Sequence, residues 1–531
     1  MAAVFMAGER TMDATMKRWG EMTSPEKAVL ALGGVVFLAH VLASMLGPYG
    51  FFRDELYFID CGRHPSFGYV DQPPLIPMLA AASMLFGRTL LVLRALPALA
   101  HAGTVIVAGA MAARVARSLG EREDVARVVA GASVALAPMY LGLHSTLDTT
   151  SFEPLAWTFM AYAAARASLG GERRWLVSLG IVAGIAMEAK YAAPFFLAPL
   201  VAGIALGPSR RIVWTREASA GVAAAVALAM PSVAWQLGHG LPFRELLHAA
   251  SHGKNTVVPP GPFLLNQLLV MNPLLAPLWI AGVGWALFAR RLAPVRFLAI
   301  AFVGVLLEMM LMHGKDYYVA PAYGVAFALG GVFAARVVRT RGTSALGAWF
   351  ALVVALTVVA IPTSMPVLPP ASLARFVVAT HTQPQAQENK QRGAVLPQLM
   401  ADMVGWRELE ATVADVWRAL PADERARTTI IAGNYGEAGA LDLYGADDGL
   451  PPARSGHNQY YLWGPGDDEP LVILRVGGDP DRWKDRCDEL TIPARFGADY
   501  VMPYEHDRPI LQCRHPRFSL RADWPDFKHY E

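Results

Sequence analysis

The chain has 531 residues, of which 54% are hydrophobic and only 17% are charged, and its mean hydropathy is +0.33. A chain of this size with so few charges is too apolar for a soluble protein, so a lipid bilayer must solvate much of it. The formal net charge of +2 is nearly balanced and gives no reason to expect nucleic acid as a partner. The composition therefore predicts an integral membrane protein.

Long apolar runs predict about eleven transmembrane helices. They follow a polar N-terminal segment, residues 1–27, and the first run is longer than a secretory signal and lacks a convincing cleavage site, so we expect it to be retained. The fifth and sixth runs are short and divided only around Lys190, and they could instead form a bent pair or a re-entrant hairpin. The predicted spans are 28–48, 90–113, 125–143, 153–169, 175–189, 191–207, 218–236, 273–289, 296–312, 318–335 and 344–362.

Arginines gather in alternate loops between these spans, which gives an independent test of the topology. By the positive-inside rule, such loops face the cytoplasm. The N-terminus is then cytoplasmic, and everything after the last span lies outside. The arginine-rich loops contain Arg114, Arg117, Arg122 and Arg127; Arg166, Arg173 and Arg174; Arg210, Arg211 and Arg216; Arg290, Arg291 and Arg296; and Arg336, Arg339 and Arg341.

The composition changes near residue 369 to a charged mixture with ordinary amphipathic periodicity, which indicates a domain boundary. We therefore divide the chain into the N-terminal segment, a membrane domain over 28–368 and a C-terminal domain over 369–531. Leu396–Leu420 is predicted to be a helix, and the β-branched runs Thr428–Ala432 and Leu471–Val476 are predicted to be strands. The C-terminal part is expected to be a small extracytoplasmic α/β domain.

Three cysteines occur, which is too few for a cysteine-rich metal site. Cys487 and Cys513 would share an oxidising compartment and could form a disulfide. In the same domain, the segment Gly433–Gly439 follows the first predicted strand and superficially resembles a nucleotide-binding turn. It lacks the standard glycine spacing, so a tight strand-to-helix turn is the favoured interpretation.

Ionisable side chains gather in the loops that face outward. Such residues are costly close to a bilayer, so they are candidates for a functional site, although each could merely anchor a helix end or pair with a neighbouring charge. A desolvated carboxylate next to a span could accept a proton, and a lysine could neutralise a phosphate. The tyrosines of the same loops could stack on a sugar or anchor at headgroup depth. The charged candidates are Asp54, Glu55, Asp148, Lys190 and Lys315.

Four segments carry a family resemblance: Arg53-Asp-Glu-Leu-Tyr57, Gly68-Tyr-Val-Asp-Gln-Pro-Pro-Leu75, Lys190-Tyr191 and Lys315-Asp-Tyr-Tyr-Val-Ala-Pro-Ala-Tyr323. They resemble bacterial membrane proteins of glycosyltransferase family 39, the superfamily of protein O-mannosyltransferases and lipid A aminoarabinose transferases. The resemblance implies a polytopic α-helical protein of the C-type glycosyltransferase fold in the bacterial inner (plasma) membrane. Its donor would be a polyprenyl-phosphate sugar, transferred with inversion to an envelope glycan, lipid or protein.

The resemblance also implies roles for individual residues. Asp54 would be the base that activates the acceptor, and Glu55 would support it. Asp148 matches a second acidic position, which shapes the acceptor site or, in some members, a divalent metal site; no other cofactor is implied. Donor phosphate would be bound by Lys190, Lys315 and Arg53, and substrate by Tyr57, Asp71, Gln72, Tyr191, Asp316 and Tyr317. No β-trefoil insertion is recognisable, which leaves the acceptor open.

Two other functions compete with the enzyme. A transporter or flippase of a lipid-linked sugar would place polar residues near the bilayer midplane, commonly within an inverted repeat, and neither feature is evident. Alternatively, the membrane half is a scaffold for a glycan-binding module. The segment Ser455–Pro465 combines aromatic and amide side chains that suit carbohydrate, and it could equally be a packed connection within the domain.

Overall fold

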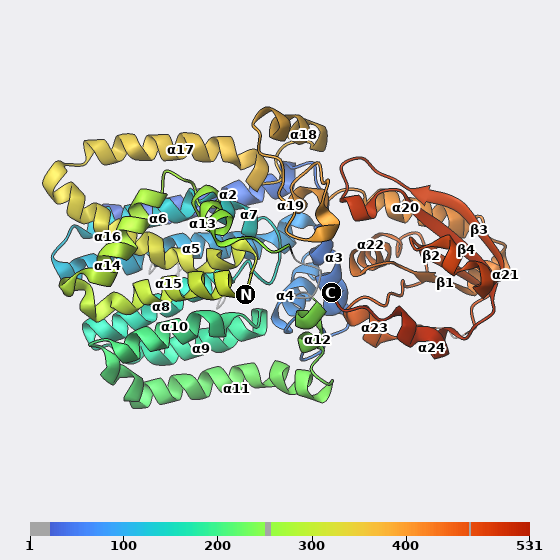
Figure 1. Cartoon of the computed structure of the whole chain (residues 1–531), viewed down its shortest axis with the longest axis horizontal. Helices are drawn as coiled ribbons and strands as arrows, with labels where there is room; N and C mark the ends of the chain where they lie inside the picture. Colours follow the sequence, from blue (N-terminus) through green and yellow to red (C-terminus); the bar gives the residue numbers. More distant parts are fainter. Residues whose placement is uncertain (1–21, 250–255, 467–468) are drawn as a thin grey trace, which may run out of the picture.

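The computed structural model describes residues 22–249, 256–466 and 469–531. A bundle of helices occupies one side of the molecule, and a smaller domain containing a β-sheet sits at one end of the bundle (Figure 1). Most of the predicted N-terminal segment, residues 1–21, lies outside the described residues. The boundary predicted at residue 369 falls between the last long helix and the short helix that follows it.

Helices form wherever an apolar run was predicted to cross the membrane. The predicted span 125–143 is divided into α6 and α7, because Pro138 cannot donate a backbone hydrogen bond and begins a new helix. The fifth and sixth runs are separate helices, with extended backbone at Lys190 between them. The helices are α2 (Ser24–Leu46), α5 (Leu90–Leu119), α6 (Glu123–Ala135), α7 (Pro138–Leu143), α8 (Glu153–Gly170), α9 (Trp175–Ala189), α10 (Ala193–Leu206), α11 (Arg216–Gly238), α14 (Ala276–Phe288), α15 (Arg296–Leu311), α16 (Tyr323–Arg341) and α17 (Ser344–Ser364).

Six helical segments in the described part of the chain are long and apolar enough to cross a bilayer. Several other apolar helices are shorter, among them α9, α10 and α14. A multi-pass helical membrane protein is therefore confirmed, whereas the count of eleven spans stays a prediction.

Several short helices lie outside the long apolar runs, and one of them, the 3₁₀ helix at Asp316–Ala322, overlaps the start of the predicted span 318–335. α3 and α4 lie between the bundle and the smaller domain (Figure 1). They share a hydrophobic cluster with it, in which Leu56 and Ile76 are buried together with Leu409 and Leu474. The short helices are α3 (Arg53–Arg63), α4 (Leu75–Met84), α12 (Pro242–Ala249), α13 (Pro260–Val270), the 3₁₀ helix η4 (Asp316–Ala322) and α18 (Pro370–Ala379).

The C-terminal domain is built on a four-stranded sheet of order β1-β2-β4-β3. β1 (Thr428–Ile431) runs parallel to β2 (Val472–Val476), and β4 (Arg508–Pro516) is antiparallel to both β2 and β3 (Cys487–Phe496). The two predicted strands are thus confirmed, while β3 and β4 had not been predicted. The helices of the domain are α19 (Gln398–Ala401), α20 (Trp406–Arg418), α21 (Ala422–Ala426), α22 (Tyr435–Tyr444), α23 (Gln459–Trp463) and α24 (Leu520–Asp523).

The predicted helix Leu396–Leu420 is wrong as one continuous element. It is divided into α19 and α20, because Gly405 adopts a φ of +88° just before α20 begins. A left-handed residue ends one helical segment and redirects the chain, and glycine adopts this conformation without a steric cost.

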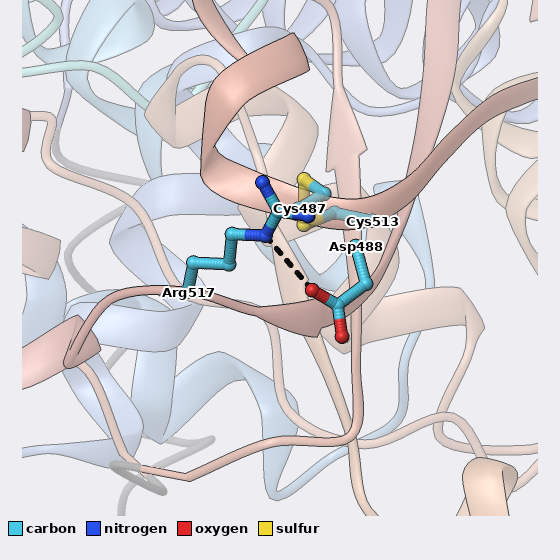
Figure 2. Close-up of a disulfide and its surroundings, with 4 residues drawn as sticks. All are labelled: Cys487, Asp488, Cys513 and Arg517. Carbon is cyan, nitrogen blue, oxygen red and sulfur yellow. Dashed lines mark hydrogen bonds and ion pairs between the residues drawn. A yellow bond between two sulfur atoms is a disulfide. The ribbon is translucent and has the colours of Figure 1, made fainter.

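A disulfide joins the edge strand β3 to its neighbour β4. Cys487 begins β3, Cys513 lies on β4, and their Cα atoms are 5.4 Å apart (Figure 2). Asp488 and Arg517 form an ion pair of 2.8 Å beside it. Cys61 is free and buried in α3. The pairing that the sequence left open is therefore made.

Candidate active site

A cavity of about 890 Å³ opens where the bundle meets the C-terminal domain. Six of the predicted site residues line it: Arg53, Asp54, Asp148, Lys315, Asp316 and Tyr317. Apolar side chains of α7, α13 and α17 form another part of its wall, including Met139, Leu143, Leu269, Leu356 and Val359. The cavity is thus charged in one region and apolar in another, which suits an amphipathic molecule.

Asp54 lies in the first turn of α3, where a helix N-terminus favours negative charge. Its Oδ1 accepts a hydrogen bond of 2.7 Å from the hydroxyl of Tyr435, a residue of the C-terminal domain. Burial, followed by the charge of Asp148, raises the pKa of Asp54 to about 7, against the opposing effect of Arg53. A carboxyl group that ionises near neutral pH is well matched to general base catalysis.

Asp148 is held by a short turn that precedes α8. Its carboxylate accepts hydrogen bonds from the Thr149 hydroxyl at 3.0 Å and the Thr150 hydroxyl at 2.9 Å, as well as from the Thr149 amide. The preceding amide, that of Leu147, donates to Oε1 of Glu55 at 2.9 Å. The carboxylate is therefore fixed in place on the wall of the cavity.

Glu55 does not line the cavity. Its side chain is fully buried and pairs through Oε2 with Arg94 of α5 at 2.7 Å, and the same oxygen also accepts from the amide of Phe52 at 2.8 Å. Through these contacts Glu55 fixes α3 against α5 and holds the turn that carries Asp148. Its predicted support of Asp54 can thus only be indirect.

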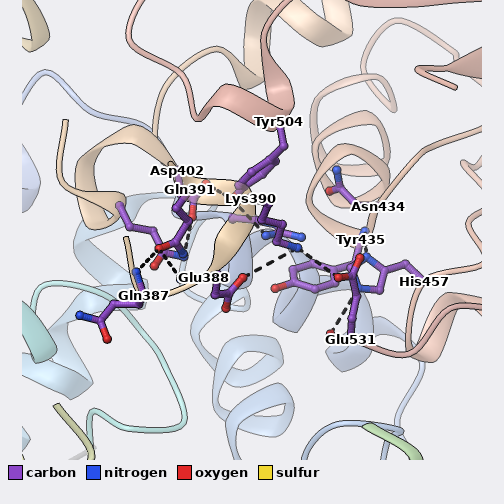
Figure 3. Close-up of polar contacts among 12 residues, drawn as sticks. Gln387, Glu388, Lys390, Gln391, Asp402, Asn434, Tyr435, His457, Tyr504 and Glu531 are labelled. Carbon is purple, nitrogen blue, oxygen red and sulfur yellow. Dashed lines mark hydrogen bonds and ion pairs between the residues drawn. The ribbon is translucent and has the colours of Figure 1, made fainter. Parts of the chain in front are cut away.

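Two lysines and two glutamates form a chain of charges on the cavity wall. Lys315 pairs with Glu388 at 2.8 Å. Figure 3 shows Lys390 between Glu388 and Glu531, with N–O distances of 3.9 and 3.5 Å respectively. Sequence reasoning missed Lys390, Glu388 and Glu531, because they belong to the segment after residue 369, where no motif marked them.

Lys190 is not among the residues that line the cavity. Its ammonium group pairs with Glu153 at 3.1 Å and lies 4.9 Å from the ring centre of Tyr318. Glu153 is the first residue of α8, so this pair connects the start of α8 to the segment between α9 and α10. A phosphate-binding role for Lys190 stays a prediction that these contacts do not favour.

Four of the predicted substrate-binding residues lie outside the cavity lining. The hydroxyl of Tyr57 donates to Oδ1 of Asp71 at 2.8 Å, and Asn458 donates to the other oxygen of Asp71 at 3.1 Å. Gln72 is buried, and Tyr191 packs edge-on against Phe243. The hydrogen bond between Asn458 and Asp71 connects the 68–75 loop to the C-terminal domain. At Asn458, the segment Ser455–Pro465 therefore forms a packed connection.

The two remaining predicted residues do face the cavity. Asp316 begins η4, and its Oδ2 accepts a hydrogen bond of 3.2 Å from Asn266 on α13. Tyr317 follows it, and its ring meets that of Tyr318 edge to face at 4.7 Å. Both residues line the cavity, and their contact with a substrate stays a prediction.

Among the described residues, Asp148 is not part of a group with the spacing of metal ligands. Within the described ranges, the group of residues with the spacing of metal ligands is His457, His529 and Glu531, whose candidate ligand atoms lie within 4.8 Å of one another. Even there, the amide of Tyr435 donates to Nδ1 of His457. This places the proton of a neutral imidazole on Nε2, the nitrogen 3.4 Å from the carbonyl of Glu531.

Comparisons with known proteins give a family match over part of the chain and structures of similar fold. Residues 71–235 match the family described as dolichyl-phosphate-mannose-protein mannosyltransferase. The crystal structure of ArnT from Cupriavidus metallidurans bound to undecaprenyl phosphate is similar, with a TM-score of 0.56 and 14% identity over 91% of this chain and 97% of that chain. Apo ArnT from the same organism gives a TM-score of 0.57 and 13% identity with the same coverage. No curated protein sequence matches the chain.

At such low identity the likeness to ArnT speaks for the fold alone. The family match covers residues 71–235, less than a third of the chain, so the chain is similar to membrane glycosyltransferases over those residues and has a polytopic helical fold like that of ArnT. The resemblance to glycosyltransferase family 39 that the motifs indicated is thereby confirmed, in the form shared by the protein mannosyltransferases and ArnT.

Proposed function

We propose that the protein transfers a sugar from a polyprenyl-phosphate donor to an envelope acceptor, with inversion at the anomeric carbon and Asp54 as the base. The observation that carries the proposal is the cavity, which joins a charged region at Asp54, Asp148 and Lys315 to an apolar wall on α13 and α17. A lipid-linked phosphosugar has the same two parts. Undecaprenyl phosphate bound to an ArnT of the same fold supports this choice of donor.

The chemistry follows from the charges in the cavity. Asp54 takes the proton of an acceptor hydroxyl, and the acceptor oxygen attacks the anomeric carbon from the face opposite the phosphate. The bond between that carbon and the phosphate oxygen breaks, and polyprenyl phosphate leaves with both electrons of the bond. Lys315 and Lys390 stabilise the charge that develops on the phosphate. Asp148 orients the acceptor beside the base.

We also propose that the C-terminal domain lies on the extracytoplasmic side of the membrane. Disulfides persist in oxidising compartments, so the bond between Cys487 and Cys513 supports an extracytoplasmic C-terminal domain. The arginine-rich loops, assigned to the cytoplasm by the positive-inside rule, support the same orientation. We infer that the protein is a multi-pass protein of the bacterial inner membrane and that its cavity opens towards the outer leaflet.

The proposal is tested with full-length protein in detergent, mixed with a panel of polyprenyl-phosphate sugars and envelope extract, with donor consumption followed by mass spectrometry. We expect wild type to consume a donor and Asp54→Asn to lose at least about a hundredfold in rate, the contribution typical of a general base. Asp423, an exposed residue of α21, provides the matched control Asp423→Asn. If neither wild type nor Asp54→Asn consumes the donor, but wild type moves it across vesicle membranes, the protein is a flippase instead.

A further inference from the structure

The residue in contact with the candidate base comes from the other domain. Tyr435 lies 381 positions after Asp54 in the sequence and donates its hydroxyl to that carboxylate. Its ring stacks on Tyr57 of α3, with ring centres 4.7 Å apart. The guanidinium of Arg53 lies 4.3 Å from the centre of the same ring. The phenol is thus held from two directions while its hydroxyl points at Asp54.

The local sequence explains how α22 reaches α3. Asn434 caps the helix by accepting from the amides of Gly436 and Glu437, so Tyr435 is the first residue of α22. A Cβ at Gly436 would lie 2.5 Å from Arg53, and one at Gly439 would lie 2.9 Å from the backbone of Leu56. Gly436 and Gly439 therefore allow α22 to pack closely against α3, which places Tyr435 against Asp54.

We propose that Tyr435 is a positioning residue for Asp54: its hydroxyl fixes the orientation of the carboxylate and stabilises the ionised form that accepts the proton. The C-terminal domain thereby completes the active site of the membrane domain. This inference rests on the proposed function, because it concerns the base of that reaction. The family match spans residues 71–235 and contains neither partner.

The other charged and titratable groups around Asp54 set the background for this hydrogen bond. Asp148 and Asp402 disfavour the ionised carboxylate, whereas Arg53 and the Tyr435 hydroxyl favour it. Lys315, at the start of η4, also interacts electrostatically with Asp54. Burial already raises the pKa of Asp54 to about 7. Loss of the hydrogen bond from Tyr435 would raise this pKa further, so that less of the carboxylate is ionised at neutral pH.

The test compares full-length wild type with Tyr435→Phe, using the donor that wild type consumes. Phenylalanine keeps the ring between Tyr57 and Arg53 and removes only the donor. We expect kcat to fall about tenfold while the donor KM changes less than about twofold, and the acidic limb of the pH profile to move to higher pH. Tyr461 of α23, whose ring packs on Trp524, gives the matched control Tyr461→Phe. This control should leave kcat and the pH profile unchanged.

Two further measurements keep the test decisive. Incorporation of 3-fluorotyrosine at position 435 strengthens the donor, so the acidic limb should move to lower pH, the opposite direction. Carbodiimide labelling of Asp54 against pH, read by peptide mass spectrometry, reports its protonation without any substrate and should show a higher midpoint in Tyr435→Phe.

The outcomes separate this inference from the proposed function. If Asp54→Asn is inactive but Tyr435→Phe keeps the wild-type kcat, pH profile and labelling midpoint, the role of Tyr435 is overturned and the transferase stands. If Asp54→Asn is as active as wild type, the base assignment fails, and the positioning role fails with it. A shift in opposite directions for phenylalanine and fluorotyrosine supports the inference.

Discussion

Lys315 and Glu388 form an ion pair of 2.8 Å on the wall of the cavity. The lysine proposed to meet the donor phosphate therefore already neutralises a carboxylate. Lys390 lies near the other oxygen of Glu388, at 3.9 Å. A phosphate that binds between the two lysines must compete with this carboxylate, which bears on the affinity for the donor.

Substitution of Glu388 by glutamine should tighten donor binding. The amide keeps the size of the side chain and removes the competing charge, so we expect the donor KM to fall about threefold to fivefold, the range that a modest ion pair contributes. Steady-state kinetics with the accepted donor measures it. Glu489→Gln, which removes a carboxylate from an exposed pair with Arg514, should have no effect, and a raised KM in Glu388→Gln would contradict the competition.

Loss of either lysine should weaken the donor complex. Lys315→Met and Lys390→Met each remove a charge that faces the cavity, and we expect the donor KM to rise about tenfold, as for a hydrogen bond to a charged group. Titration with a polyprenyl phosphate by calorimetry gives the same comparison without turnover. The control is Lys484→Met, which changes an exposed lysine of the sheet domain. Unchanged affinity in both variants would move the phosphate site elsewhere.

The pH dependence of kcat/KM should reveal a carboxyl group that ionises near neutrality. The pKa of Asp54 is raised to about 7, chiefly by burial, so the base is protonated below that value. We expect kcat/KM to be constant above about pH 8 and to fall about tenfold per pH unit below about pH 6. An ordinary aspartate would place this limb near pH 4. A flat profile between about pH 5 and 8 would exclude Asp54 as described.

The buried pair of Glu55 and Arg94 should be essential for folding of the α3 region. Removal of one partner leaves an uncompensated buried charge, at a cost of about 3–5 kcal/mol. We expect Arg94→Met and Glu55→Gln each to lower the melting temperature sharply. The double variant should recover part of the loss, because neither charge is then unpaired; equal, additive losses would contradict the coupling.

The disulfide should stabilise the C-terminal domain. Its two cysteines are 26 positions apart in the sequence, for which chain entropy predicts a contribution of about 3.5 kcal/mol. The variant Cys487→Ser with Cys513→Ser should therefore melt at a lower temperature, whereas Cys61→Ser tests the free thiol. Alkylation of unreduced, denatured protein should label Cys61 and leave Cys487 and Cys513 unmodified. Labelling of Cys487 and Cys513 would refute the bond.

Local sequence patterns determined the elements of this protein. Each predicted apolar span contains helix, and the β-branched runs at 428–432 and 471–476 became β1 and β2, because hydrophobic periodicity acts over a few turns or a few residues. Local backbone properties also explain why two predicted helices are each divided in two. Pro138 begins the separate helix α7, and Gly405 precedes α20 in a left-handed conformation. The ionisable residues of the loops predicted to face outward were recognisable because charge near a bilayer is costly.

The tertiary structure decided which of those residues share a cavity. It brought Asp54, Asp148 and Lys315 together, turned Glu55 towards Arg94, and paired Lys190 with Glu153 away from the cavity lining. It also added Tyr435 from the C-terminal domain to the contacts of Asp54. Adjacent positions on a helix point in different directions, and contacts between residues hundreds of positions apart depend on how whole elements pack. Sequence motifs record which residues are present, whereas packing alone sets where their side chains point.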